Sequence, residues 1–378
     1  MPPPNKTLSL GFIGGSISSA VGYTHFVSCQ LDHRWKVVSG CFSRDEQQSH
    51  TTAQNWQIPA EKTYSDWRAY IAAEKDNLDA VAVLTPTPDH ADIVCTLIEK
   101  GVPVICEKAM AASLEQSAAI QDALELHKGF LAMTYNYSGY PLLRVLRKHV
   151  QNGDLGTLKQ IQIEMPSDGF IQPNDRMAPQ QWRLKDGPIP TILLDLAVHL
   201  HHLTHFLTGL TPKSVNADFH HDSTFQGIID DAYLWVKYNQ DFRASMWVSK
   251  TALGYRNGLK LRLFGDHASA EWLQENPERL HIYQKDTTCT TYDRGNCHHP
   301  EEIRERFKPG HPGGFVEAFA NLYNDIADTL IDFRKEGQYA SPYVFGWNHA
   351  DQGLRLLYGA SKANTERVWQ PLSEDTSA

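Results

Sequence analysis

A chain of 378 residues is long enough for roughly two to three domains. Its 35 lysines and arginines against 44 acidic residues give a net charge of −9, which argues against nucleic acids and anionic membrane surfaces as partners, because both bind basic faces. With 41% hydrophobic and 10% aromatic residues, the composition is typical of a folded globular protein and excludes disorder over the whole chain.

Short apolar runs in the first third of the chain predict strands that alternate with helices. A helix is expected over residues 89–100, because Gly101 is suited to the position just after a helix end. Another is expected from Ser113, because Gln116 follows it at the spacing of a capping box. Strands separated by helices predict parallel β-α-β units and a doubly wound, Rossmann-type α/β sheet. The expected strands are 8–13, 36–42, 78–84, 102–106 and 130–134.

The rest of the chain shows a different pattern, with strand-like segments that follow one another almost without helices. Such runs predict an α+β domain with a large open antiparallel sheet. We place the boundary between two domains so that they cover residues 1–134 and 135–378. The main expected strands are 158–165, 231–238, 242–249, 259–264 and 268–273, and the expected helices are 141–151, 192–207, 314–333 and 346–364.

A glycine turn follows the first expected strand, at Gly14, Gly15 and Ser16. A turn of this kind lets the backbone approach a pyrophosphate, which then lies at the N-terminus of the next helix. Ser16 stands at the usual position of the second glycine, so a turn without any ligand is an equal alternative.

The end of the second expected strand bears on the choice of dinucleotide. A carboxylate there would bind the ribose 2′-hydroxyl of NAD. This chain has Ser43 and Arg44 instead, and a guanidinium is suited to a 2′-phosphate. The cofactor is therefore NAD or NADP, with NADP favoured, unless Arg44 is an ordinary solvated residue.

Polar residues also follow the third and fourth expected strands. Thr85, Pro86 and His90 come after one strand, and Glu107 and Lys108 come after the next. Ligands of doubly wound sheets bind outside the carboxyl ends of the strands, so these positions are candidates for cofactor contacts. A surface ion pair is the alternative for Glu107 and Lys108.

Histidine is abundant, with 18 residues in the chain. Asp195 and His199 are four residues apart on the expected helix 192–207, so the carboxylate can orient the imidazole and raise its basicity, as a general base needs. His201 and His205 are predicted to be core or surface histidines. No third metal ligand is evident, so we predict no metal site.

Together these residues resemble the Gfo/Idh/MocA family of oxidoreductases, named for glucose-fructose oxidoreductase and inositol dehydrogenase. The glycine turn, Thr85-Pro86, Glu107-Lys108 and Asp195-x-x-x-His199 occur in the order and at the spacing of that family. Three further motifs are similar to one of its branches: Asn136-Tyr137-Ser138-Gly139-Tyr140-Pro141, Gln181-Trp182-Arg183 and His311-Pro312-Gly313-Gly314-Phe315.

The resemblance implies an N-terminal Rossmann domain that binds NAD or NADP and a C-terminal domain that binds substrate and mediates oligomerisation. It implies hydride transfer at a carbinol of a sugar or cyclitol, with Lys108, Asp195 and His199 as catalytic residues. Trp182 and Arg183 would close over the cofactor, and Asn136 is placed at the cofactor site. Pairing through the C-terminal sheet into a homodimer or homotetramer is also implied.

The chain departs from the family pattern at a few positions. Ser16, Ala109 and Ala197 stand where the family usually has glycine, proline and glycine, and residues 187–191 replace a glycine-rich stretch. These departures leave open a regulatory relative that binds a dinucleotide or sugar without turning it over. A metal-dependent hydrolase or lyase that uses the histidine cluster is the third hypothesis.

The cellular compartment is inferred from the cysteines and the N-terminal residues. Six cysteines without C-x-x-C spacing are typical of reduced thiols. The first residues lack the apolar segment of a secretory signal, and no run approaches the ~20 apolar residues that span a bilayer. We therefore expect a cytoplasmic protein.

Overall fold

The computed structural model describes residues 7–171, 179–297, 302–339 and 341–372. The chain forms two compact units, of which the first comprises Met1–Gly139 with Phe315–Asp351 and the second comprises Tyr140–Gly314 with Gln352–Ala378. This division differs from the predicted boundary after residue 134, because a late segment of the chain returns to the first unit. Across the described residues, no helix combines the length and the apolar character needed to cross a bilayer.

The first unit is built on a parallel sheet with the strand order β2-β1-β3-β4-β5. All five strands were predicted, and the central β3 is buried along its whole length, which explains its uninterrupted apolar sequence. The strands that follow β1 in the chain lie on both sides of it, with β2 on one side and β3 on the other. The point between β1 and β3 is therefore a topological switch point, where such sheets bind ligands. The strands are β1 (Leu8–Gly14), β2 (Trp35–Cys41), β3 (Ala80–Leu84), β4 (Val104–Cys106) and β5 (Leu131–Met133).

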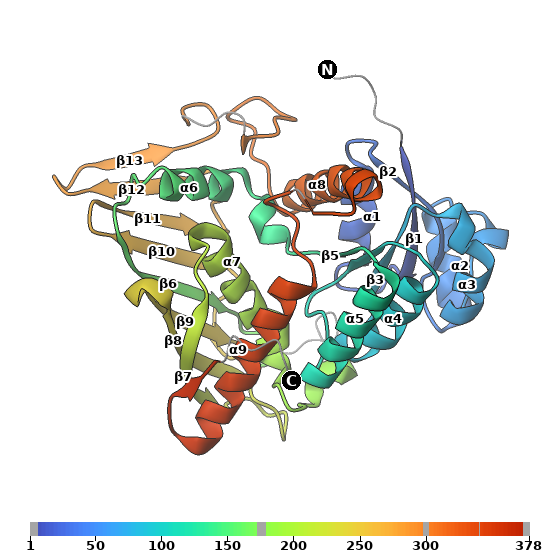
Figure 1. Ribbon diagram of the computed structural model, residues 1–378, viewed down its shortest axis with the longest axis horizontal. Coiled ribbons are helices and arrows are strands. Elements are labelled where there is room, and N and C mark those ends of the chain that lie inside the picture. The colour runs from blue at the N-terminus through green and yellow to red at the C-terminus, as the bar shows by residue number, and fades with distance from the viewer. Residues whose placement is uncertain (1–6, 172–178, 298–301, 340, 373–378) are drawn as a thin grey trace. The chain divides into compact units, whose positions relative to one another are not determined.

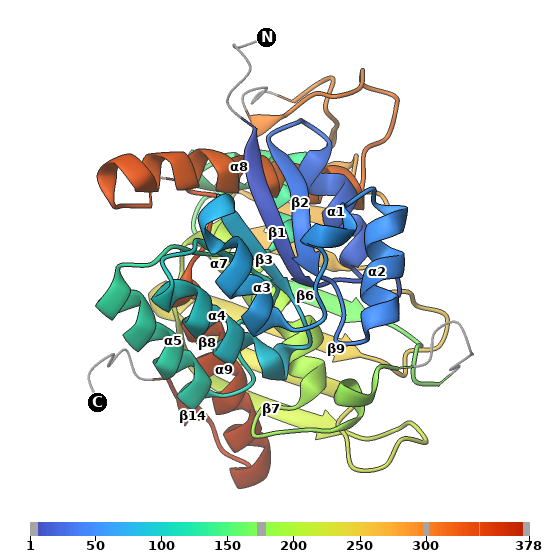
Figure 2. The same cartoon turned by 90° about the vertical axis from the view of Figure 1, so that its right-hand side faces the viewer.

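Helices accompany this sheet, with α4 and α5 lying together and α1 lying against α8 (Figures 1 and 2). The predicted cap of α5 is confirmed, because the Ser113 hydroxyl accepts a hydrogen bond from the Gln116 N–H at 3.3 Å. In return, the Gln116 side chain accepts one from the Ala112 N–H at 2.8 Å. The helices are α1 (Gly22–Gln30), α2 (Glu46–Asn55), α3 (Trp67–Glu74), α4 (His90–Glu99), α5 (Leu114–His127) and α8 (Phe315–Glu336).

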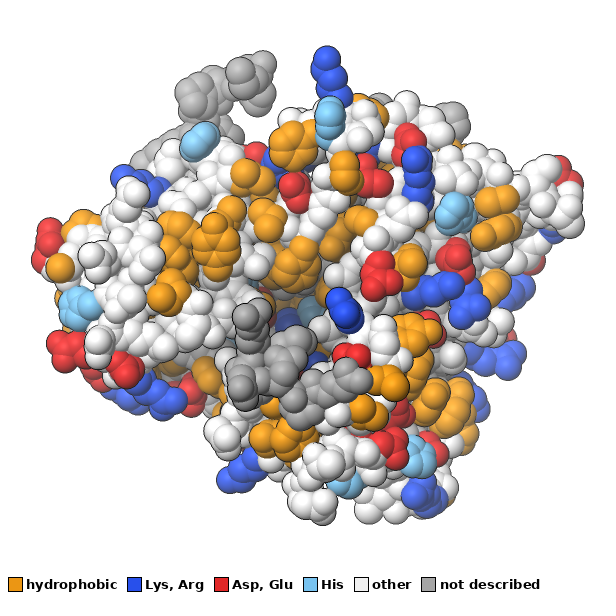
Figure 3. Space-filling view, turned by 180° about the vertical axis from the view of Figure 1, so that it is seen from behind, with side chains coloured by type: hydrophobic (Ala, Val, Ile, Leu, Met, Phe, Trp, Pro, Cys, Tyr) orange, Lys and Arg blue, Asp and Glu red, His pale blue; other side chains and the backbone are white. Residues whose placement is uncertain are grey.

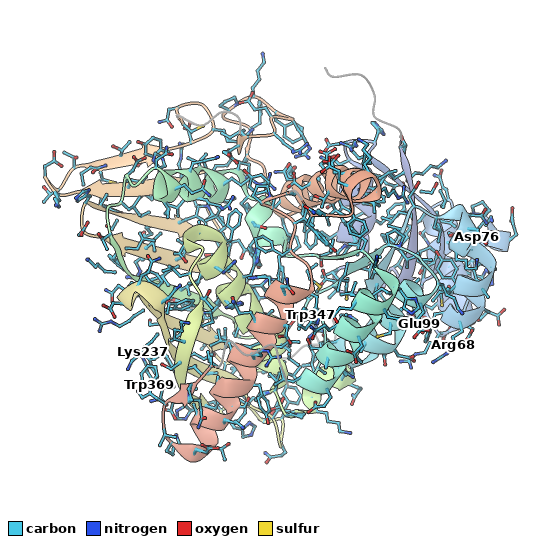
Figure 4. The ribbon with its side chains drawn as sticks, in the orientation of Figure 1. Arg68, Asp76, Glu99, Lys237, Trp347 and Trp369 are labelled. Carbon is cyan, nitrogen blue, oxygen red and sulfur yellow. The ribbon has the colours of Figure 1, made fainter. Side chains whose placement is uncertain are left out.

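Two tryptophans hold the late segment of the chain in the first unit. The Trp35 indole on β2 donates a hydrogen bond to the Tyr323 carbonyl of α8 at 2.8 Å. Trp347, at the start of α9 (Trp347–Glu366), donates to the Ser117 carbonyl of α5 at 2.8 Å (Figure 4). Buried side chains of α8, such as Phe319, pack into the core of the unit.

The second unit is built on a nine-stranded sheet with the order β13-β12-β11-β10-β6-β9-β8-β7-β14. The predicted open antiparallel sheet is confirmed, except that the pair β6 and β9 runs parallel. Alternation along a strand shows which residues face the core, but it does not show the direction of the neighbouring strand. The strands are β6 (Leu158–Pro166), β7 (Pro212–His220), β8 (Asp231–Tyr238), β9 (Arg243–Ser249), β10 (Lys260–Gly265), β11 (Ala268–Leu273), β12 (Leu280–Gln284), β13 (Cys289–Tyr292) and β14 (Gln370–Pro371).

One face of this sheet is covered by α6 (Pro141–Gln151) and α7 (Val198–Thr208) (Figure 1). On the other face, Tyr233, Trp235 and Lys237 of β8 are exposed, whereas the residues between them are buried. The Lys237 ammonium lies 4.3 Å from the centre of the Trp369 ring (Figure 4). Acidic, basic and hydrophobic side chains lie interspersed over the surface seen in Figure 3.

Candidate cofactor and catalytic sites

The glycine turn after β1 has the geometry of a nucleotide cradle. Gly14 and Gly15 have φ angles of +83° and +74°, which L side chains rarely adopt. A Cβ at Gly14 would lie 2.8 Å from the Leu84 backbone, and a Cβ at Gly22 would lie 2.0 Å from the Gly15 carbonyl oxygen. The turn therefore needs glycine for both conformation and close packing. Ser16 is buried, and its hydroxyl lies 3.0 Å from that of Ser18.

The end of β2 carries the predicted pair Ser43 and Arg44. The Ser43 hydroxyl accepts a hydrogen bond from the Asp45 N–H at 3.1 Å, just before α2. The Arg44 side chain is 83% exposed, and its guanidinium is 3.9 Å from the half-exposed carboxylate of Asp89. Such an exposed pair contributes little to stability, so the guanidinium is available to an anionic ligand.

Two buried polar atoms at the carboxyl edge of the parallel sheet fit a ligand. The Thr85 hydroxyl follows β3, and the Asn136 amide nitrogen follows β5. Neither atom has a hydrogen-bond partner among the described residues, although both are buried. Because an unsatisfied buried polar group costs roughly 1–3 kcal/mol, a bound dinucleotide that hydrogen-bonds to these groups would remove that cost. The residues present therefore fit the cofactor that this fold binds.

His90, a predicted cofactor contact, lies between two backbone carbonyls. Its ring is fully buried, with Nε2 2.8 Å from the Thr85 carbonyl oxygen and Nδ1 2.8 Å from the Ala109 carbonyl oxygen. Burial lowers the pKa of His90, so the neutral ring donates to one of the two carbonyls at a time. His90 therefore links the segments that follow β3 and β4.

Glu107 lies in a buried network at the end of β4. The His25 Nε2 is 3.0 Å from a Glu107 oxygen, and the Thr134 hydroxyl donates a short hydrogen bond to the same oxygen. Burial acts to raise the pKa of Glu107, but the His25 hydrogen bond, the charges of His25 and Lys108, and the Thr134 hydrogen bond lower it to about 2. Since the ionised carboxylate only accepts hydrogen bonds, His25 donates through Nε2.

The other nitrogen of His25, Nδ1, lies 2.8 Å from the Tyr323 hydroxyl of α8. The network therefore joins α1, β4 and α8, and it leads directly to Lys108, whose peptide bond to Ala109 is cis. Sequence analysis missed His25, Thr134 and Tyr323, because no motif marks them. They are far from Glu107 along the chain, and packing alone brings them to it.

In the second unit, Asp195 and His199 lie on one continuous helical segment. The predicted helix over residues 192–207 is confirmed, and its first part, Leu193–Ala197, is a π-helix that leads into α7. Such π-helical turns are rare and frequent at functional sites. His199 is buried at the start of α7, and the Asp195 side chain is 11% exposed.

Asp195 lies between two cations. Arg183 places Nε 3.4 Å and Nη2 3.5 Å from its two oxygens, and the Lys250 Nζ is 3.1 Å from one of them. The Arg183 guanidinium also lies 4.4 Å from the centre of the Trp182 ring. Arg183 and Trp182 were predicted to lie over the cofactor, and the structure additionally brings Arg183 to Asp195. Lys250 was missed, because it follows β9 without a motif around it.

The remaining histidines of α7 behave as core residues. Burial, with a smaller effect of the His205 charge, lowers the pKa of His201 to about 3, and burial lowers that of His202 well below its usual range. Their rings are therefore neutral. Among the described residues, no group of three or more His, Cys, Asp or Glu side chains is arranged to hold a metal ion.

The sequence matches two family profiles that together span most of the chain. Residues 8–135 match "Oxidoreductase family, NAD-binding Rossmann fold", and residues 143–271 match "GFO/IDH/MocA C-terminal domain". The oxidoreductase YfiI of Bacillus subtilis, described as uncharacterised, is 26% identical over 385 residues, which cover 97% of each chain. Levoglucosan dehydrogenase of Pseudarthrobacter phenanthrenivorans is 28% identical over 150 residues, which cover 39% of this chain and 37% of that one.

Solved structures share the fold over the same length. An inositol dehydrogenase homologue of Azotobacter vinelandii, complexed with NADH and myo-inositol, superposes with a TM-score of 0.88 over 97% of this chain and 98% of its own, at 23% identity. An oxidoreductase of Pseudomonas syringae superposes with a TM-score of 0.86 over 97% and 99% of the two chains, at 24% identity.

Proposed function

Because the chain belongs to the GFO/IDH/MocA family of oxidoreductases, we propose that it transfers a hydride between a sugar or cyclitol carbinol and a nicotinamide dinucleotide. The observation that carries the proposal is the pair of buried, unsatisfied polar atoms on Thr85 and Asn136, beside a turn that only glycines can form. The relatives named for inositol and levoglucosan support the polyol substrate class.

The first unit would hold the cofactor. Gly14, Gly15 and Ser16 receive the pyrophosphate, in the way that turns before a helix N-terminus bind phosphates. Further contacts at the strand ends are expected from Pro86, Glu107 and Lys108, with Thr85 and Asn136. Trp182 and Arg183 are also candidate cofactor contacts, as the family resemblance implies. His90 would position Thr85 through the contact between its Nε2 and the Thr85 carbonyl oxygen described above. When bound, the nicotinamide supplies the hydride chemistry.

We favour NADP over NAD. The chain offers Ser43 and Arg44 at the end of β2 in place of a carboxylate, and the Arg44 guanidinium is exposed and weakly paired. A 2′-phosphate would gain a charge-assisted hydrogen bond there.

Three side chains of the protein would accept the substrate's proton and stabilise the charge that develops on it. His199 takes the proton of the substrate hydroxyl, as a general base. Asp195, one helical turn earlier, orients the imidazole. Lys108 stabilises the developing alkoxide electrostatically.

The test is initial-rate reduction of NAD+ and NADP+ by a panel of sugars and cyclitols, together with fluorescence titration of both dinucleotides. Lys108→Ala is expected to lower kcat by ~100-fold or more, whereas Lys100→Ala, at an exposed helix end, leaves it unchanged. Absence of dinucleotide binding would refute the proposal. Binding without turnover over a broad panel would favour a regulatory protein instead.

We also propose that the chain forms a homodimer or homotetramer through the open face of the nine-stranded sheet. Tyr233 stacks on Trp235 and on Trp247 there, with ring centres 6.3 and 5.8 Å apart, and Tyr233 and Trp235 are more than 40% exposed. Exposed aromatic clusters of this kind mark interaction surfaces. A monomeric mass by light scattering would refute this oligomerisation.

We expect the protein in the cytoplasm, where its six free thiols stay reduced.

A further inference from the structure

In the second unit, two cations face the carboxylate of Asp195. Arg183 comes from the short helical turn Gln181–Leu184, and Lys250 comes from the residue after β9. Both cations approach the same carboxylate. Among the described residues, Asp195 is the one carboxylate within 4 Å of either cation.

These three side chains are largely withdrawn from solvent. The exposed fractions are 11% for Asp195, 13% for Lys250 and 23% for Arg183. Charges that are removed from water need compensation by a partner of opposite sign. At ion-pair distance, one carboxylate therefore faces two cations.

The two cations differ in how many of their N–H donors have an acceptor within the protein. All three Arg183 nitrogens face protein acceptors: Nε and Nη2 face Asp195, and Nη1 donates to the side-chain oxygen of Gln180. The Lys250 ammonium has three N–H donors, and Asp195 is its one described acceptor. Lys250 is therefore the cation that can still bind an external acceptor.

Lys250 is also held in place before any ligand arrives. Its N–H donates to the Asp230 carbonyl at 2.8 Å, and its carbonyl accepts from the Phe170 N–H at 2.9 Å. These bonds fix the backbone on both sides of the residue. The ion pair with Asp195 at 3.1 Å holds the ammonium itself, so less side-chain freedom is lost when an anion binds.

We propose that the substrate carries an anionic oxygen group, a carboxylate or a phosphate, which binds the Lys250 ammonium beside Asp195. The enzyme would then act on polyol acids or polyol phosphates in preference to neutral sugars. This inference rests on the proposed function as a polyol dehydrogenase and specifies its substrate class.

The experiment compares kcat/KM for matched probes in the presence of NAD+ or NADP+. D-glucose and myo-inositol are the neutral probes, D-gluconate and D-glucuronate carry a carboxylate, and D-glucose 6-phosphate carries a phosphate. Each probe is also tested by thermal shift with the dinucleotide bound. The wild-type chain is expected to prefer one anionic class by at least ~10-fold, the size of one charge-assisted hydrogen bond. Which class is preferred distinguishes a carboxylate from a phosphate.

Variants then assign the preference to Lys250. Lys250→Gln is expected to lower the ratio of anionic to neutral kcat/KM by ~10-fold or more, and Lys250→Arg, which retains the charge, is expected to restore most of it. Lys159→Gln, a 57% exposed position on β6, is the matched control and keeps the wild-type ratio.

Three results would overturn the inference: equal use of neutral and anionic probes, equal losses for both classes in Lys250→Gln, or dinucleotide binding with no anion-dependent thermal shift. Each leaves the proposed function standing. That function fails separately if the chain binds no dinucleotide.

Discussion

The buried histidines of α7 should make the fold sensitive to mild acid. In the native state, burial and the nearby His205 lower the pKa of His201 from 6.5 to about 3. In the unfolded chain the imidazole regains its ordinary pKa and takes up a proton below pH 6.5. Because the unfolded state then binds more protons, the free energy of unfolding falls as the pH drops from 6.5 towards 3.

The magnitude follows from linkage between protonation and unfolding. One pH unit below 6.5, at about pH 5.5, a single such histidine costs about 1.4 kcal/mol of stability. His202, whose pKa is also lowered by burial, acts in the same direction. The variant His201→Gln keeps a polar side chain of similar size and removes the titrating group. The loss of stability between about pH 7.5 and pH 5.5 should therefore be smaller by about 1.4 kcal/mol in this variant.

The assay is urea denaturation of wild type and variant at both pH values, followed by circular dichroism. The control is His50→Gln, because the His50 side chain is 46% exposed and lies outside the buried cluster of α7. If wild type and His201→Gln lose equal stability between the two pH values, the burial argument is refuted.

The remaining predictions concern the first unit. Gly14→Ala should abolish dinucleotide binding in a fluorescence titration, because its Cβ would lie 2.8 Å from the Leu84 backbone at a φ of +83°; unchanged affinity would show that the turn does not receive the cofactor. Arg44→Ala should raise the KM for NADP+ by ~10-fold and leave that for NAD+ unaltered, and equal effects on both would remove the 2′-phosphate assignment. His25→Leu should destabilise the fold by about 3–5 kcal/mol in urea denaturation, because it leaves the ionised Glu107 buried without its main partner; a loss below about 1 kcal/mol would contradict this.

The two units bear on function in different ways. In the proposed function, the first unit holds the dinucleotide through backbone geometry and a few polar atoms. The second surrounds Asp195 with cations from two elements that are distant in sequence. We expect substrate choice to depend mainly on the second arrangement, since charge at a buried position discriminates strongly between neutral and ionised ligands.

Sequence patterns among neighbouring residues were enough to predict most of the strands and helices of this protein. The apolar runs predicted all five strands of the parallel sheet, and the glycines after the first of them predicted the tight turn that the structure shows. These features depend on backbone preferences and side-chain spacing among near neighbours, which the sequence contains directly. The spacing of Asp195 and His199 likewise placed both on one helical segment.

Tertiary structure alone decided which distant residues meet. It returned α8 to the first unit, ran β6 parallel to β9, and brought His25 to Glu107 and Lys250 to Asp195. The physical reason is that such contacts depend on how the whole chain packs, and no residue beside Glu107 or Asp195 specifies its remote partner. Sequence therefore pointed to the candidate reacting groups, and the folded structure determined the charges that surround them.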